Sequence, residues 1–172
     1  MADMLIITFI AEDRPGVVEI LSDIVEAHGG NWLESRMAHL AETFAGVARV
    51  QVPKAKSSGL KEALAELAED GFQVMVREAG GGEPPGGSII DFEIVGLDHP
   101  GIVHELTRTI AALRASVEEM ETWTEGAPHG GGMLFHARAS VRLPDGLSED
   151  GFRDALEDSA TALVVDIVIG EA

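Results

Sequence analysis

The sequence predicts an α+β protein built from two copies of one unit, each with the order strand, helix, strand, strand, helix, strand. The first observation is an internal repeat, because residues 13–18 (DRPGVV) recur 85 positions later as residues 98–103 (DHPGIV). The second is periodicity. Apolar residues spaced by three and four follow each copy, as in amphipathic helices, and alternating apolar residues come next, as in half-buried strands. A repeat of this length marks a duplicated structural unit.

The predicted elements follow the same order in both halves. A β-type run precedes each motif and an amphipathic helix follows it. Two alternating strands then form a hairpin, before a second helix and a closing strand. The predicted ranges are 5–10, 18–25, 31–39, 44–52, 60–67 and 72–76 in the first half, and 89–95, 103–110, 116–124, 135–143, 152–160 and 163–169 in the second.

The two halves differ in their hairpins. Residues 44–53 align with residues 135–144 at an offset of 91 positions, so the second half contains six additional residues between its motif and this strand. The segment 125–132 (EGAPHGGG) is rich in glycine and is the predicted longer hairpin loop.

A second glycine-rich segment predicts the domain boundary. Residues 79–88 (AGGGEPPGGS) combine flexible glycines with two prolines, which is typical of a linker. The segment lacks the Lys-Ser or Lys-Thr pair of a phosphate-binding loop. We therefore expect a first domain at 1–78, a linker at 79–88 and a second domain at 89–172.

The order of elements predicts the ferredoxin-like fold. Right-handed crossovers place both helices of a βαββαβ unit on one face of a four-stranded antiparallel sheet. The sequence therefore predicts two ferredoxin-like units in tandem, with antiparallel sheets and helices on one face. Proteins of this fold have many unrelated functions, so function has to be argued from particular residues.

Charge and composition exclude several classes of function. The chain has 12 basic and 30 acidic residues and a net charge of −18, which opposes direct binding to nucleic acid or to an anionic membrane. It has no cysteine, which excludes disulfides, thiolate metal sites and a cysteine nucleophile. The N-terminal segment lacks the pattern of a signal peptide, and no apolar run is long enough to span a bilayer. We therefore expect a soluble cytoplasmic protein.

Enzymatic and metal-binding roles receive little support. An acylphosphatase-like hydrolase needs an Arg in the first loop and an Asn on the second strand. Because the chain has Arg14 and Asn31, an acylphosphatase-like hydrolase is the lower-ranked alternative. The six histidines lack the HExxH spacing of a zinc site, and no pair of carboxylates is marked as catalytic. We therefore expect a protein that is not an enzyme, with no catalytic residue, no metal site and no cofactor.

The first motif has the chemistry of a site for a small zwitterion. Pro15 favours a helical backbone in a first turn, and Gly16 lets a ligand approach the main chain. The free N–H groups at the following helix start, from Val17 onward, suit a carboxylate. Asp13 either accepts from an ammonium group or caps the helix, two roles that the sequence does not separate. Asn31 carries both a donor and an acceptor, and either binds ligand or stabilises the start of a strand.

These residues carry a resemblance to a known family. A first-loop Asp-Arg-Pro-Gly before an apolar helix, followed by Gly29-Gly30-Asn31 at a strand start, resembles the ACT domain, a family of regulatory modules that bind amino acids. The resemblance covers both halves and includes tandem ACT proteins such as the glycine cleavage system transcriptional repressors. It implies an amino-acid site at Asp13, Arg14, Pro15, Gly16, Val17 and Asn31, and a second site at Asp98, His99, Gly101 and Ile102.

The resemblance implies a regulator that acts through other proteins. We expect a response to a small amino acid, with glycine or serine favoured, and a protein partner such as a transcription activator in place of direct DNA binding. We also expect a homodimer. The alternative is a stand-alone ACT scaffold that binds an enzyme of amino-acid metabolism.

Overall fold

The chain divides into two units, residues 1–83 and 84–172. The structure is a computed structural model that describes residues 1–80, 86–163 and 165–170. Residues 81–85 of the predicted linker lie outside the described residues, so the linker assignment stays a prediction.

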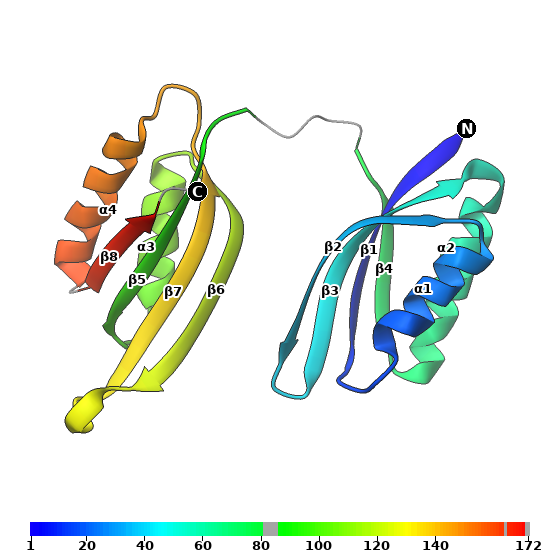
Figure 1. Ribbon diagram of the computed structural model, residues 1–172, viewed down its shortest axis with the longest axis horizontal. Coiled ribbons are helices and arrows are strands. Elements are labelled where there is room, and N and C mark those ends of the chain that lie inside the picture. Colours follow the sequence, from blue (N-terminus) through cyan, green and yellow to red (C-terminus); the bar gives the residue numbers. More distant parts are fainter. Residues whose placement is uncertain (81–85, 164, 171–172) are drawn as a thin grey trace. The chain divides into compact units, whose positions relative to one another are not determined.

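Unit 1 is a four-stranded antiparallel sheet in the order β2-β3-β1-β4, and helices α1 and α2 both lie on one face of it (Figure 1). This is the predicted ferredoxin-like arrangement. Short 3-10 turns flank α2, at Lys54–Lys56 and Leu67–Asp70. The elements are β1 Ala2–Glu12, α1 Val17–Ala27, β2 Asn31–Leu40, β3 Thr43–Pro53, α2 Ser57–Glu66 and β4 Gln73–Glu78.

Unit 2 repeats this arrangement, with the strand order β6-β7-β5-β8 and helices α3 and α4 on one face (Figure 1). The duplication and the fold class predicted from the repeat are confirmed. The elements are β5 Ile89–Leu97, α3 Ile102–Ala112, β6 Ser116–Gly126, β7 Met133–Arg142, α4 Glu149–Leu163 and β8 Val165–Gly170.

Each core lies between the sheet and its helices, because strand residues of one parity and one stripe of each helix face inward. In β1, Leu5, Ile7 and Phe9 are fully buried, and they meet Leu21 and Val25 of α1. Burying one such side chain contributes about 1.5–3 kcal/mol. The second core has the same construction, with Ile90, Phe92, Ile94, Leu106, Ile110, Phe152 and Leu156. Strand residues of the other parity form an open sheet face in each unit.

The predicted insertion lies in the second hairpin. In unit 1, β2 and β3 are joined by a two-residue turn at 41–42, where Ala41 takes a left-handed backbone. In unit 2, residues 127–132 join β6 to β7 and include a short 3-10 turn, Pro128–Gly130. The longer loop therefore leaves the strands and their register intact.

Among the described residues, the longest helix is α4, with 15 residues, and its first turn carries Glu149 and Asp150. None of the helices in this part of the chain combines the length and the apolar character needed to cross a membrane.

Candidate functional site

The loop between β1 and α1 lies at one end of unit 1 and is hydrogen-bonded to the neighbouring turn. The backbone N–H of Asp13 donates to the carbonyl of Glu42 at 3.0 Å, which fixes the loop to the turn between β2 and β3. Gly16 precedes the helix with φ 93° and ψ 0°, a left-handed conformation that favours glycine. Pro15 lies in the turn before the helix, and not in its first turn as predicted, because the left-handed Gly16 stands between them.

The start of α1 offers unpaired N–H groups. The carbonyl of Gly16 accepts the first helical hydrogen bond, from the N–H of Ile20 at 2.9 Å. The N–H groups of Val17, Val18 and Glu19 come earlier in the helix and therefore have no intrahelical acceptor. They carry the partial positive charge of the helix dipole, which attracts an anionic group.

A pocket of about 300 Å³ lies beside this helix start. It brings together four of the predicted site residues, whereas Pro15 belongs to the same loop without lining the pocket. Sequence reasoning missed three lining residues. Val18 and Glu19 are the residues after the predicted motif, and Phe44 comes from the neighbouring strand β3. The lining residues are Asp13, Arg14, Gly16, Val17, Val18, Glu19 and Phe44.

Asp13 faces a histidine and does not cap the helix. The cap position of α1 is Gly16, which has no side-chain capping hydrogen bond. The Oδ2 atom of Asp13 lies 3.4 Å from Nε2 of His39 at the end of β2. Both side chains are about half exposed, so the carboxylate remains open to a ligand in the pocket.

Arg14 contacts the turn that precedes β4 in unit 1. Its Nη2 atom donates to the carbonyl of Asp70 at 3.2 Å, and its guanidinium carbon lies 5.5 Å from the ring centroid of Phe72. A cation over an aromatic face contributes about 0.5–1 kcal/mol at an exposed site. Arg14 therefore ties the loop to the turn before β4 while it lines one wall of the pocket.

Asn31 lies at the opposite end of the sheet from this pocket. It begins β2 opposite Gln51, whereas Leu40 at the other end of β2 pairs with Thr43 beside the loop. Nine residue steps along a strand span about 30 Å. Within one unit, Asn31 and Arg14 do not meet, which removes the arrangement that an acylphosphatase-like site needs.

The loop between β5 and α3 has the same backbone conformation as the loop between β1 and α1. The two differ in the hydrogen bonds at the start of the following helix. Gly101 has φ 92°, and the N–H of Asp98 donates to the carbonyl of Met133 at 2.9 Å. Nδ1 of His99 lies 3.1 Å from the carbonyl oxygen of Pro100. The N–H of Ile102 donates to the carbonyl of His99 at 3.3 Å, whereas no corresponding bond is found for Val17 in the described part of unit 1. One N–H group at the helix start is thus already used in unit 2.

Among the described residues, no group of three or more histidine, aspartate or glutamate side chains is placed to hold a metal ion. The contact between Nε2 of His136 and Oε1 of Glu125, at 2.9 Å, joins only two such groups.

Comparison with known families agrees with the fold and the loop. The family model of the ACT domain matches residues 3–77. The matched residues lie in unit 1, and unit 2 repeats the topology and the DxPG loop of unit 1, so the fold of the chain is that of two ACT-like units in tandem.

Two solved structures resemble the chain over its whole length. A protein from Galdieria sulphuraria that is described as unknown is 29% identical, with a TM-score of 0.83, and the match covers 100% of this chain and 99% of that one. A protein provisionally named a glycine cleavage system transcriptional repressor is 17% identical, with a TM-score of 0.75, covering 99% and 97%. The second likeness shows the fold alone. No curated protein matches the sequence.

Proposed function

We propose that the protein is a non-enzymatic regulator that binds a small amino acid at the start of α1 and transmits this signal through a protein partner. The observation that carries the proposal is the pocket of about 300 Å³, which combines helix N–H groups with two carboxylates, Asp13 and Glu19. Donors and acceptors of both charges within one small pocket suit a zwitterion.

The two ends of an amino acid have separate partners in this pocket. The N–H groups of Val17 and Val18 receive the ligand carboxylate. The carboxylates of Asp13 and Glu19 receive the ammonium group. A Cβ atom on Gly16 would lie 3.8 Å from Oε2 of Glu19, so a side chain at this position would take up space next to that carboxylate. In this proposal the favoured ligands are glycine and serine.

Asn31 joins the site from a second molecule in this proposal. It lies about 30 Å from the loop of its own unit by strand geometry, so it reaches a ligand only across an interface. A homodimer therefore completes the site. An amino acid that binds one assembly more tightly than another shifts the population toward it, which is the physical basis of the response.

The output is a contact with another protein. The net charge of −18 opposes DNA and favours a partner with a basic surface, such as a transcription activator. The name of the structural relative, a glycine cleavage system transcriptional repressor, supports a role in the control of glycine metabolism. We place this role in the cytoplasm.

A thermal melt against a panel of amino acids tests the ligand site. Ligand at about 100 times its Kd stabilises the folded state by roughly 2.7 kcal/mol, a shift of several degrees for a chain of this size. Gly16→Ala places a side chain in the pocket, and Gly101→Ala is the matched control, because φ is 93° at Gly16 and 92° at Gly101. Each variant is expected to lose about 1–2 kcal/mol through backbone strain alone.

We expect glycine or serine to raise the Tm of the parent and of Gly101→Ala, and to leave the Tm of Gly16→Ala unchanged. An equal shift in both variants would exclude the pocket at α1. Retardation of DNA in a gel by the protein without an activator would refute the partner model.

A further inference from the structure

The open sheet face of unit 1 is apolar at its centre. An antiparallel sheet with helices on one side usually presents polar residues on the other. Here Ile6 of β1 and Val47 of β3 occupy the middle of the open face, and Met75 of β4, beside them on the same face, is 69% exposed. Met4 and Ile10, also on the open side of β1, are each more than one-third exposed. Exposed apolar side chains gathered on one face mark an interaction surface.

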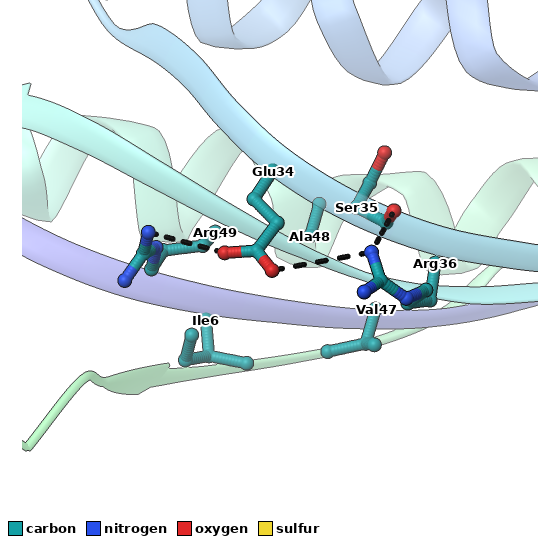
Figure 2. A pocket seen from close by; sticks show the side chains of 7 residues that line it. All are labelled: Ile6, Glu34, Ser35, Arg36, Val47, Ala48 and Arg49. Atoms are coloured by element: carbon teal, nitrogen blue, oxygen red, sulfur yellow. Dashed lines mark hydrogen bonds and ion pairs between the residues drawn. The ribbon is translucent and has the colours of Figure 1, made fainter. Parts of the chain in front are cut away.

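Arginines surround this apolar centre. Figure 2 shows Glu34 between Arg49 and Arg36, with Ile6 and Val47 next to each other below them. Oε2 of Glu34 lies 3.1 Å from Nη2 of Arg49, and its Oε1 lies 3.9 Å from Nη1 of Arg36. A hollow of about 200 Å³ lies among these residues. Arg77 of β4 adds a third guanidinium group opposite Ile6, so three guanidinium groups share this face with two carboxylates, those of Glu12 and Glu34.

The open face of unit 2 is acidic at the matching positions. By the repeat, Asp91 stands where unit 1 has Ile6, and Glu121 stands where unit 1 has Arg36. Trp123 lies among these carboxylates, stacked on His136 with ring centroids 4.9 Å apart. Strands β5, β6 and β7 carry six carboxylates and two guanidinium groups, and one carboxylate, that of Glu118, accepts a hydrogen bond from Nε of Arg142 at 2.7 Å. The other residues are Asp91, Glu93, Glu119, Glu121 and Glu125, with Arg138 and Arg142.

We propose that the open face of unit 1 in one molecule docks on the open face of unit 2 in a second copy of this chain. The guanidinium groups of Arg36, Arg49 and Arg77 then face carboxylates, and the apolar centre covers the indole of Trp123. Complementary charge steers and aligns such a contact, although two chains of charge −18 repel each other at long range. This contact is different from the one that brings Asn31 of a second copy to the amino-acid site, and the inference goes beyond that site and does not depend on it.

The available area supports a reciprocal dimer. Four strands spaced by about 4.8 Å, and about eight residues along each strand, make each face roughly 19 by 26 Å, or about 500 Å². In a reciprocal dimer each copy uses both of its faces and buries about 1,000 Å². A stable interface needs about 800 Å² per partner, so two contacts reach this area and one does not.

Charge reversal tests the pairing by sedimentation equilibrium. Arg49→Glu with Arg77→Glu makes the face of unit 1 acidic, and Asp91→Lys with Glu119→Lys makes the face of unit 2 basic. Asp91 and Glu119 both lie opposite Ser140, so the new lysines avoid a directly opposed arginine. We expect each pair to weaken the dimer at least 100-fold, and all four changes together to restore it to within about tenfold, because their net charge equals that of the parent.

A control separates this effect from net charge. Lys54→Glu with Lys56→Glu changes the charge by the same amount in the 3-10 turn before α2, outside the open face, and is expected to leave the dimer intact. A parent protein that stays monomeric up to about 1 mM would overturn the proposal, since even weak dimers form at that concentration. A fourfold variant that fails to dimerise while its circular dichroism spectrum matches the parent would also overturn it.

A single substitution tests the apolar centre, with a control that adds the same charge elsewhere. Met75→Asp is expected to weaken the dimer about 10- to 100-fold. Met133→Asp is the matched control, because Met133 is 48% exposed and has the same parity on β7 as buried Phe135, away from the open face. Equal dimerisation of both variants and the parent would contradict the docking face. Gly16→Ala is expected to dimerise normally, so failure of the ligand proposal is distinguishable from failure of this one.

Discussion

The two units share one topology and fill the same core position in different ways. In unit 1, Phe9 lies opposite Gly46 on the neighbouring strand, and in unit 2 the equivalent residues are Ile94 and Ala137. A Cβ atom on Gly46 would come within 2.8 Å of Cζ of Phe9. The larger aromatic ring therefore requires the smaller partner. A duplicated fold can diverge at single positions provided that the volumes of facing residues change together.

The functional surfaces of the two units differ more than their cores. Unit 1 combines a pocket at its loop with an apolar, arginine-lined open face, whereas the open face of unit 2 is acidic. These surfaces are made of exposed residues, which the fold does not constrain. This difference agrees with the proposal that an amino acid binds in unit 1.

The largest expected effect comes from removing a core ring, which tests whether the units are independent. Phe9→Ala and Phe92→Ala each delete a side chain that is at most 2% exposed, and each is expected to cost about 3–5 kcal/mol in its own unit. Each unit contains one tryptophan, Trp32 or Trp123, so replacing the other one by Phe gives a reporter for a single unit.

Urea unfolding in dilute solution, followed by tryptophan emission, measures the effect. We expect Phe9→Ala to lower the midpoint seen by Trp32 and to leave the midpoint seen by Trp123 unchanged, and the reverse for Phe92→Ala. Equal changes at both reporters would show that the chain unfolds as one cooperative body, and the comparison of two independent units would fail.

The next largest expected effect on stability comes from changing the sizes of two facing core residues, Phe9 and Gly46. Gly46→Ala is expected to destabilise unit 1 by about 1–3 kcal/mol, because the new methyl group is overpacked against Phe9, Met37 and the carbonyl of Arg36. Phe9→Ile added to Gly46→Ala copies the pair of unit 2 and is expected to recover part of this loss. Urea midpoints of the single and double variants give the coupling. Strictly additive effects would contradict the volume argument.

The fold was predictable from the sequence because it depends on patterns that repeat. The DxPG motif, the helix stripes and the alternating strands occur twice, so each copy supports the interpretation of the other. Element ends were less predictable. The first strand was expected at 5–10 and extends over Ala2–Glu12, because ladder hydrogen bonds with β3 continue beyond the apolar core residues.

The site was predictable only where it is local in sequence. Asp13, Arg14, Gly16 and Val17 are neighbours in the chain and meet in one pocket. Phe44 reaches the pocket from another strand, which no local pattern reveals. The left-handed backbone of Gly16 displaced Pro15 from the helix, and the antiparallel course of β2 carried Asn31 to the far end of the sheet.

A smaller effect concerns the ends of the first helices. Gly29 follows α1 with φ 68°, and at the equivalent position after α3 Arg114 takes φ 58°, which strains a residue with a side chain. Arg114→Gly is expected to stabilise unit 2 by about 0.5–1 kcal/mol, and Gly29→Ala to destabilise unit 1 by about 1 kcal/mol. A Cβ on Gly29 meets only ordinary contacts at 3.8 Å, so the loss reports the backbone alone. Thermal melts in which both changes act in the same direction would contradict this assignment.

The smallest change in stability should accompany the most selective change in function. Asp13→Asn removes a half-exposed carboxylate that lies 3.4 Å from His39, and Asp98→Asn changes the equivalent residue of unit 2. Exposed pairs of this kind contribute about 0–1 kcal/mol. The free energy of unfolding of both variants, measured in urea, is therefore expected to stay within that range of the parent. Asp13→Asn keeps the size of the side chain and loses the negative charge that the ligand ammonium group needs.

We therefore expect the rise in Tm caused by glycine or serine to disappear in Asp13→Asn and to persist in Asp98→Asn. Because neither variant alters the left-handed glycines or the hydrogen bonds from residues 13 and 98 to the hairpins, a difference between them reports charge at the pocket and not loop folding. If Asp98→Asn abolished the response and Asp13→Asn kept it, the ligand site would belong to unit 2. The functional roles proposed for the two units would then have to be exchanged.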